Sequence, residues 1–270
     1  MTVLLTNDDG VFAPGLAAMA SAMADALASS GEVYVAAPDH NCSGNSHHLN
    51  MIEPIPVSEV AVSGAARAWA VGGTPADCVR LAVSTLLPCR PDVVVSGINL
   101  GDNLSTDCLY SGTVGAAMEG LLMDLPALAV SVYTEQVQNA SDALRFASDG
   151  GTFDGAAALG VRLVRWLVKN GRPMALNLNV PLGTDGLPPL RVVPIDRVRR
   201  YRGDHYLRTE ENGRTVYCFV GAPCDKEDPS SDIAAVEQGY AALTPLTPFW
   251  TDVAALDGLQ RQLADGAFED

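Results

Sequence analysis

Short apolar runs separated by a helical segment open the chain. Residues 3–6, 32–37 and 91–96 are apolar or β-branched, and we predict that each forms a buried strand. Residues 14–30 are rich in Ala and Met, with Pro14 in the first turn and Gly31 after the last, which predicts a helix. A strand, a helix and a second strand in this order predict a βαβ unit, and therefore parallel strands.

The alternation of helices and strands continues along the chain. We predict helices over residues 74–87, 112–123, 153–170 and about 251–263, and strands over 127–132, 174–180 and 240–243. Residues 51–72 predict short strands, 134–150 have a weak pattern, and 190–221 predict an antiparallel hairpin that projects from the core. The predicted fold class is α/β: a doubly wound three-layer sandwich with a largely parallel sheet, plus a β-hairpin excursion.

Composition and charge limit the classes of function. The chain has 270 residues, of which 48% are hydrophobic, and this supports a sizeable core in one large α/β domain, with or without a small appendage. It carries 17 Lys and Arg against 32 Asp and Glu, a net charge of −15. Binding of a nucleic acid polymer is disfavoured, because that affinity comes from clustered Lys and Arg. Binding of small phosphorylated ligands is not excluded, because a local cation can override the overall negative charge.

The first residues and the cysteines indicate the compartment. The N-terminus lacks the basic and apolar regions of a signal peptide, and no apolar run approaches the roughly 18 residues of a membrane span. Six scattered cysteines without a C-x-x-C pair are typical of free thiols in a reducing compartment. We therefore expect a cytoplasmic protein without membrane contacts.

Three polar loops leave predicted strands at their carboxyl ends, over residues 7–10, 39–46 and 97–112. In open parallel sheets these ends form the ligand-binding edge, so we expect the loops to converge. Asp8 and Asp9 are adjacent acids in the first loop, and two such carboxylates repel each other unless a cation neutralises them. Their oxygens suit Mg²⁺ or Mn²⁺, although the same residues also favour an ordinary turn.

The other two loops offer further polar groups. Ser43 could add a hydroxyl to the same centre or belong to a plain polar loop, while His47 and His48 are interpreted as solvated loop histidines. Ser111, Gly112 and Thr113 begin a helix, where free N–H groups and hydroxyls favour either an anion such as phosphate or a simple helix cap. Asn7 precedes the two acids, so the Asp-x-Asp pattern of an aspartyl-phosphate mechanism is absent.

Together these segments resemble the survival protein SurE family of 5′/3′-nucleotidases. The matching motifs cover nearly the whole chain and lie at residues 4–11, 13–15, 37–39, 43–46, 73–79, 95–99, 110–114, 177–181 and 242–246. The departures are His40 in place of a common Arg, residues 105–108, Ser231 in place of Thr, and the region 134–152.

The resemblance implies a phosphomonoesterase that needs one divalent metal ion, Mg²⁺ or Mn²⁺. It would hydrolyse nucleoside 5′- and 3′-monophosphates to nucleoside and phosphate, in some members with exopolyphosphatase activity. By resemblance the metal ligands are Asp8, Asp9, Ser43 and Asn99, and Asp8 or Asp9 would also orient or deprotonate the attacking water. The substrate-binding residues would be Asn103, Ser111, Gly112 and Thr113.

The resemblance also implies a homodimer or homotetramer that binds small nucleotides and no nucleic acid polymer. We expect a single domain over residues 1–270, with a core over about 1–185 and hairpin and C-terminal oligomerisation elements over about 190–270. Two alternatives stay open: a non-catalytic nucleotide-binding or regulatory protein on the same scaffold, and a hydrolase of a different small metabolite.

Overall fold

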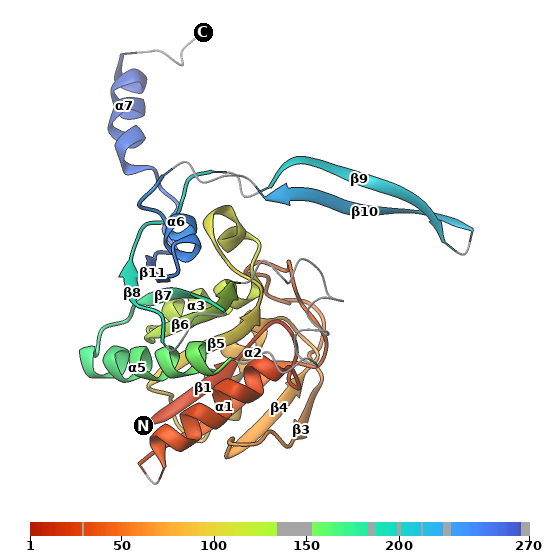
Figure 1. Ribbon diagram of the computed structural model, residues 1–270, viewed down its shortest axis with the longest axis vertical. Coiled ribbons are helices and arrows are strands. Elements are labelled where there is room, and N and C mark those ends of the chain that lie inside the picture. The colour runs from red at the N-terminus through yellow and green to blue at the C-terminus, as the bar shows by residue number, and fades with distance from the viewer. Residues whose placement is uncertain are drawn as a thin grey trace.

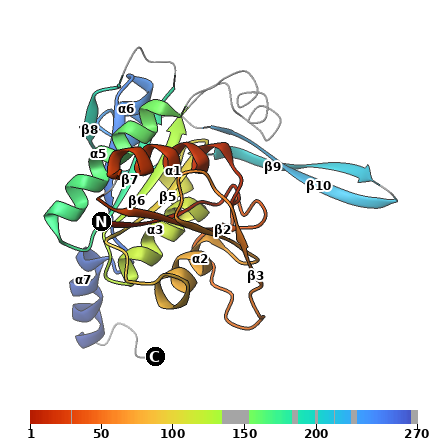
Figure 2. The same cartoon turned by 90° about the horizontal axis from the view of Figure 1, so that it is seen from below.

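A central sheet with helices on both faces forms the body of the molecule (Figures 1 and 2). The structure is a computed structural model that describes residues 1–28, 30–133, 153–182, 187–198, 201–211, 213–223 and 228–265. Within these residues the sheet has nine strands: β1 (Thr2–Thr6), β2 (Glu32–Pro38), β3 (Val57–Val60), β4 (Arg67–Val71), β5 (Val93–Leu100), β6 (Ala127–Tyr133), β7 (Ala175–Pro181), β8 (Leu190–Val192) and β11 (Ala241–Leu246).

The order of the strands places a topological switch beside β1. The order is β3-β4-β2-β1-β5-β6-β7-β11-β8, and the pairs from β4 through β2, β1, β5 and β6 to β7 are parallel. The chain builds outward from β1 through β2 to β4 and then returns to β5 on the other side of β1. Ligands bind at such a switch, beyond the carboxyl ends of the strands. The predicted α/β fold with a largely parallel sheet is confirmed.

Helices cover the two faces in pairs, in keeping with the alternation of side chains along each strand. The helices are α1 (Pro14–Leu27), α2 (Pro75–Leu81), α3 (Gly112–Leu122), α5 (Asp154–Asn170), α6 (Asp232–Glu237) and α7 (Val253–Ala264). Val3 and Leu5 of β1 pack into the core that α1 and α5 cover, whereas Leu4 faces the core beneath α2 and α3. Each apolar strand is thus buried on both faces, as its sequence predicts.

The starts of the helices follow their sequences. Pro14 occupies the first turn of α1, and the buried residues Leu16, Met19 and Met23 recur at helical spacing. At α2, Thr74 accepts a hydrogen bond from the Asp77 N–H group, and the Asp77 carboxylate accepts one from the Thr74 N–H group. This reciprocal capping fixes the entry of α2.

Two local predictions need correction. The sequence predicts a polar loop over residues 97–112, but β5 continues to Leu100 and a short 3-10 helix, η2, forms at Ser105–Leu109. The strand continues because its pairing with β6 shifts register after Ser96, so that Asn99 lies opposite Ser131. Helix α2 is also shorter than expected, since a π-helical turn, η1 (Ala82–Leu86), follows it.

The last third of the chain adds two projecting elements and two strands. A hairpin of β9 (Tyr201–Glu211) and β10 (Arg214–Pro223) extends away from the sheet, and α7 lies apart from the core (Figure 1). This confirms the predicted hairpin for these strands. The preceding segment differs: β8 pairs in parallel with β11 in the central sheet rather than joining the hairpin. The region of weak pattern at 134–150 lies outside the described residues.

Candidate active site

Three polar loops meet at the carboxyl ends of β1 and β5, as the sequence predicts. The Cys42 N–H group donates to the Asp8 carbonyl oxygen at 2.7 Å and so ties the loop after β2 to the end of β1. The Leu100 N–H group contacts Asp9 Oδ2 at 3.4 Å and brings in the end of β5. The N-terminus of α3 reaches Asp8 through Thr113.

Asp8 is buried and is held by the start of α3. The Thr113 hydroxyl donates to Oδ1 at 2.6 Å, and the Thr113 N–H group donates to Oδ2 at 3.1 Å. Both carboxylate oxygens are therefore oriented by one residue. The first turn of a helix carries partial positive charge, which favours the ionised carboxylate.

Asp9 lies beside Asp8 with fewer contacts. Burial raises the pKa of Asp8, in spite of the opposing hydrogen bonds from Thr113. Burial, followed by the charge of Asp8, raises the pKa of Asp9 to about 7. Two carboxylates that lose solvation and repel each other gain most from a cation between them. The pair therefore has the electrostatic character of a cation site.

Ser43 and Asn99 lie in the two segments that contact these acids. Ser43 is exposed next to Cys42, and its N–H group donates to Asn41 Oδ1 at 2.9 Å. The Asn99 amide donates from Nδ2 to the Gly101 carbonyl at 2.8 Å. The opposite atom of this planar amide, Oδ1, is an acceptor and can serve as a ligand. Coordination by Asp8, Asp9, Ser43 and Asn99 stays a prediction.

The chemistry of these donors defines the kind of ion they fit. Two carboxylates, a hydroxyl and an amide oxygen are hard oxygen ligands, which suit Mg²⁺ or Mn²⁺. Among the residues that the structure describes, no group of three or more His, Cys, Asp and Glu residues could hold a metal ion. The soft or imidazole-rich sites typical of zinc are thus absent from this part of the chain.

Asn103 is fixed by neighbours that the sequence analysis did not single out. Its Nδ2 atom donates to Ser131 Oγ at 2.7 Å, and its N–H group donates to Asn179 Oδ1 at 2.8 Å. Asn177 and Asn179 each donate from Nδ2 to its carbonyl oxygen. The sequence signal was two asparagines two residues apart in an otherwise apolar strand, which places both on one face.

Ser111 and Thr113, at the start of α3, form different hydrogen bonds. Ser111 caps the helix and accepts a hydrogen bond from the Val114 N–H group at 3.1 Å, so its hydroxyl keeps a proton to donate. Thr113 instead bonds to Asp8 with both of its donors. Binding of phosphate by Asn103, Ser111, Gly112 and Thr113 stays a prediction, and the structure gives Thr113 an additional contact.

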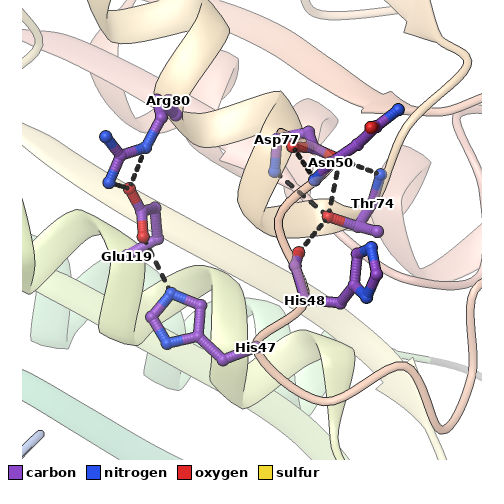
Figure 3. A network of polar contacts seen from close by, with 7 residues as sticks. All are labelled: His47, His48, Asn50, Thr74, Asp77, Arg80 and Glu119. Carbon is purple, nitrogen blue, oxygen red and sulfur yellow. Dashed lines mark hydrogen bonds and ion pairs between the residues drawn. The ribbon is translucent and has the colours of Figure 1, made fainter. Parts of the chain in front are cut away.

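The interpretation of both histidines as solvated is wrong for His47. Its Nε2 atom donates to Glu119 Oε2 at 2.8 Å, and Arg80 pairs with the other oxygen of the same carboxylate (Figure 3). The side chain of His48 is exposed, as expected. Glu119 lies 72 residues from His47 in the chain, so no local spacing in the sequence could have revealed the pair.

Comparison with known proteins decides the family. A family model described as "Survival protein SurE" matches residues 3–202. The chain belongs to the survival protein SurE family. A relative named 5′-nucleotidase SurE from Desulforudis audaxviator is 41% identical over 273 residues, covering 98% of each chain. Another SurE relative with the same name, from Chloroflexus aggregans, is 42% identical over 267 residues, covering 97% of this chain and 98% of its own.

A solved SurE structure has the same fold. The crystal structure of the SurE protein from Aquifex aeolicus matches with a TM-score of 0.74 and 32% identity, covering 97% of this chain and 100% of that chain. In the described part of this SurE-family chain, no helix is long and apolar enough to cross a membrane. Cys42, Cys78, Cys89, Cys108 and Cys218 are free, and Cys224 lies outside the described residues.

Proposed function

We propose that this chain is a 5′-nucleotidase that hydrolyses nucleoside monophosphates to nucleoside and phosphate with the help of one Mg²⁺ or Mn²⁺ ion. The observation that carries the proposal is the pair of adjacent acids, buried Asp8 and half-buried Asp9, at the switch point of the sheet, with Asp8 bonded to the start of α3. Relatives that match nearly the whole chain at about 40% identity bear the name 5′-nucleotidase. We extend the proposal to 3′-monophosphates and to terminal phosphates of polyphosphate.

The metal ion would be held by the hard oxygen donors at the end of β1 and in the two neighbouring segments. These donors are the carboxylates of Asp8 and Asp9, the Ser43 hydroxyl and the Asn99 amide oxygen. When bound, a divalent ion supplies positive charge for the phosphate oxygens and lowers the pKa of a bound water. The raised pKa values of both acids support this assignment, because such carboxylates are stabilised by a neighbouring cation.

Asp8 and Asp9 differ in the number of hydrogen bonds that their carboxylates accept. Both oxygens of Asp8 accept hydrogen bonds from Thr113, so Asp8 is a fixed ligand. Asp9 accepts one long hydrogen bond, on Oδ2, from Leu100. We assign to Asp9 the task of orienting the attacking water and accepting its proton on Oδ1. The Ser111 hydroxyl, which keeps a proton to donate, would then face a phosphate oxygen, whose charge persists in the transition state.

Thr113→Val tests how far Asp8 depends on its hydroxyl partner. The variant loses the 2.6 Å hydrogen bond to Oδ1 and keeps the backbone bond to Oδ2. We expect kcat for a nucleoside 5′-monophosphate to fall about tenfold, because loss of a residue that orients a metal ligand costs at least that much. Thr113→Ser restores the hydroxyl and is expected to recover most of the rate. Equal kcat in Thr113→Val and the wild type would contradict the role of the hydroxyl.

A panel of phosphate esters, assayed for phosphate release with and without Mg²⁺ or Mn²⁺, tests the function itself. We expect metal-dependent release from nucleoside 5′-monophosphates. Tight binding of nucleotides without release would favour the non-catalytic alternative. Failure to cleave any ester in the panel would favour a hydrolase of a different metabolite.

We also propose that the chain is a cytoplasmic homodimer or homotetramer assembled through its projecting elements. Free cysteines suit a reducing compartment. Large apolar side chains are exposed on the hairpin and around α7, at Tyr206, Leu207, Tyr217, Phe249, Trp250, Leu256, Leu259 and Leu263. Clustered exposure of this kind is typical of interfaces.

Charges placed on the apolar face of α7 are expected to break the assembly. Leu259→Glu combined with Leu263→Glu should lower the mass measured by light scattering to that of a smaller species. The matched control is Gln260→Glu with Gln262→Glu, which adds the same charge to exposed positions on the same helix. An unchanged mass in the leucine variant would show that α7 takes no part in assembly.

A further inference from the structure

A buried glutamate joins three segments of the chain next to the candidate site. Glu119 of α3 is fully buried. Its Oε1 atom accepts a hydrogen bond from Arg80 Nε of α2 at 2.7 Å and forms an ion pair with Arg80 Nη2 at 2.6 Å. Its Oε2 atom accepts one from His47 Nε2 at 2.8 Å (Figure 3). Burial acts to raise the pKa of Glu119, but the bonds and charges of His47 and Arg80 outweigh it and leave the pKa lowered.

Stability alone gives little reason for a charged cluster in this place. The carboxylate of Glu119 loses its hydration on folding, and replacing buried charges by well-packed apolar residues is often neutral or stabilising, whereas the partly exposed side chains of Arg80 and His47 keep part of their hydration. The cluster instead fixes the orientation of His47 and Arg80 relative to Glu119. A carboxylate with both oxygens engaged holds its partners in one geometry, which an apolar contact does not do.

His47 belongs to the loop that carries Ser43. Hydrogen bonds hold this loop at Cys42 and at Ser46, on either side of Ser43. On one side the Cys42 N–H group donates to the Asp8 carbonyl at 2.7 Å. On the other side the Ser46 N–H group donates to the Tyr110 carbonyl at 2.9 Å, and Ser46 Oγ donates to the Leu109 carbonyl at 2.6 Å. Ser43 lies between these two attachments.

Next to this second attachment, the backbone of the loop packs against α3 at Gly115, four residues before Glu119. A Cβ atom on Gly115 would lie 2.7 Å from the Ser46 carbonyl oxygen and 2.9 Å from His47 Cα, so the loop backbone contacts the helix there. Beyond His47, the Thr74 hydroxyl donates to the His48 carbonyl oxygen (Figure 3). Ser46 is thus held through its backbone and its hydroxyl, His48 through its carbonyl oxygen, and His47 through its imidazole by Glu119.

We propose that Glu119 and His47 are positioning residues of the metal site, which fix the loop after β2 so that the Ser43 hydroxyl can act as a ligand together with Asp8 and Asp9. Arg80 completes the cluster by holding the second oxygen of Glu119. This inference rests on the proposed function, because it takes Ser43 as a ligand of the metal ion. It extends the site from the metal ligands to Glu119, which lies about two helical turns after the start of α3.

Binding of Mn²⁺ to the full-length chain, measured by isothermal titration calorimetry well below the unfolding temperature, tests the proposal. His47→Ala is expected to raise the Kd for Mn²⁺ about tenfold, the usual size of such a supporting effect. His47→Gln retains an N–H donor for Glu119 and is expected to restore most of the affinity. The matched control is His48→Ala, which removes an exposed imidazole from the same loop and keeps the carbonyl contact to Thr74.

A double-mutant cycle shows whether His47 acts through Ser43. In the Ser43→Ala background, His47→Ala is expected to weaken Mn²⁺ binding no further, since the ligand it positions is gone. An equal loss in both backgrounds would overturn the proposal, because it would mean general damage to the fold. Equal affinity in His47→Ala and His48→Ala, or failure of His47→Gln to restore binding, would overturn it as well.

The same titrations separate this proposal from the proposed function. If wild type binds Mn²⁺ and Asp8→Asn abolishes the binding, the metal site stands, and the His47 variants decide the positioning role alone. If wild type binds no Mn²⁺, the metal-dependent function fails and the positioning role fails with it.

Discussion

Asp8→Asn and Asp9→Asn are each expected to lower kcat/KM for a nucleoside 5′-monophosphate by about 10³-fold. Each change removes a negative oxygen donor from the predicted metal site, and loss of one preorganised electrostatic group in an active site has an effect of this size. The loss in Asp9→Asn should lie mainly in kcat, because we assign to this residue the acceptance of a proton from water. Steady-state phosphate release at saturating Mn²⁺ measures both parameters.

The folded state is expected to survive these substitutions. Burial raises the pKa of both acids, so their charge is costly in the metal-free chain, and a neutral amide of the same shape removes that cost. Urea unfolding of the metal-free variants should show midpoints no lower than that of the wild type. Asp25→Asn, at an exposed position of α1, is the control and should leave activity unchanged. Turnover by both site variants at the wild-type rate would contradict the assignment of the metal site.

Gly112→Ala is expected to reduce kcat about 100-fold through a displacement of Asp8. A Cβ atom on Gly112 would lie 2.9 Å from Asp8 Cβ and 3.1 Å from Asp8 Oδ2, with Pro75 Cγ at 3.2 Å on another side. The Asp8 Cβ atom is attached to the backbone of the β1 end and cannot swing aside. Either α3 or Asp8 must therefore move, and a shift of about 1 Å in a catalytic group can cost 10²-fold in rate.

A second glycine provides the matched control for this steric argument. Gly155 lies in the first turn of α5 and has no heavy atom within 4 Å of the position of an added Cβ. Gly155→Ala should leave kcat unchanged and raise the free energy of unfolding by up to about 1 kcal/mol, since alanine favours the helix. Wild-type kcat in Gly112→Ala would show that Asp8 and the start of α3 are packed less closely than the structure describes.

Local sequence patterns were sufficient for most of the fold and for the centre of the site. The β1–α1–β2 unit follows from its two apolar runs and Pro14, because these signals act within a few residues of the chain, whereas α1 ends at Leu27, before the end that Gly31 predicts. Asp8 and Asp9 could be singled out because they directly follow a buried strand, and parallel strands place such positions at one edge. The motifs also sufficed to identify the family before any geometry was known.

The features that the sequence did not reveal depend on contacts between distant segments. His47 was interpreted as solvated because its partner, Glu119, comes from a helix 72 residues later. The resemblance places Thr113 among the phosphate-binding residues, and the structure adds a contact that the sequence did not reveal, from both donors of Thr113 to the Asp8 carboxylate. The place of β8 in the central sheet likewise depends on its pairing with β11, which comes about fifty residues later.

The most direct test of the account is a titration of the metal-free chain with Mn²⁺ in the presence of a nucleoside 5′-monophosphate, with inorganic phosphate measured. We expect no release without Mn²⁺, an increase as Mn²⁺ is added, and saturation at one ion per chain. The same titration of Asp9→Asn should stay near the background. Phosphate release that is independent of Mn²⁺, or no release once one ion is bound, would contradict the account.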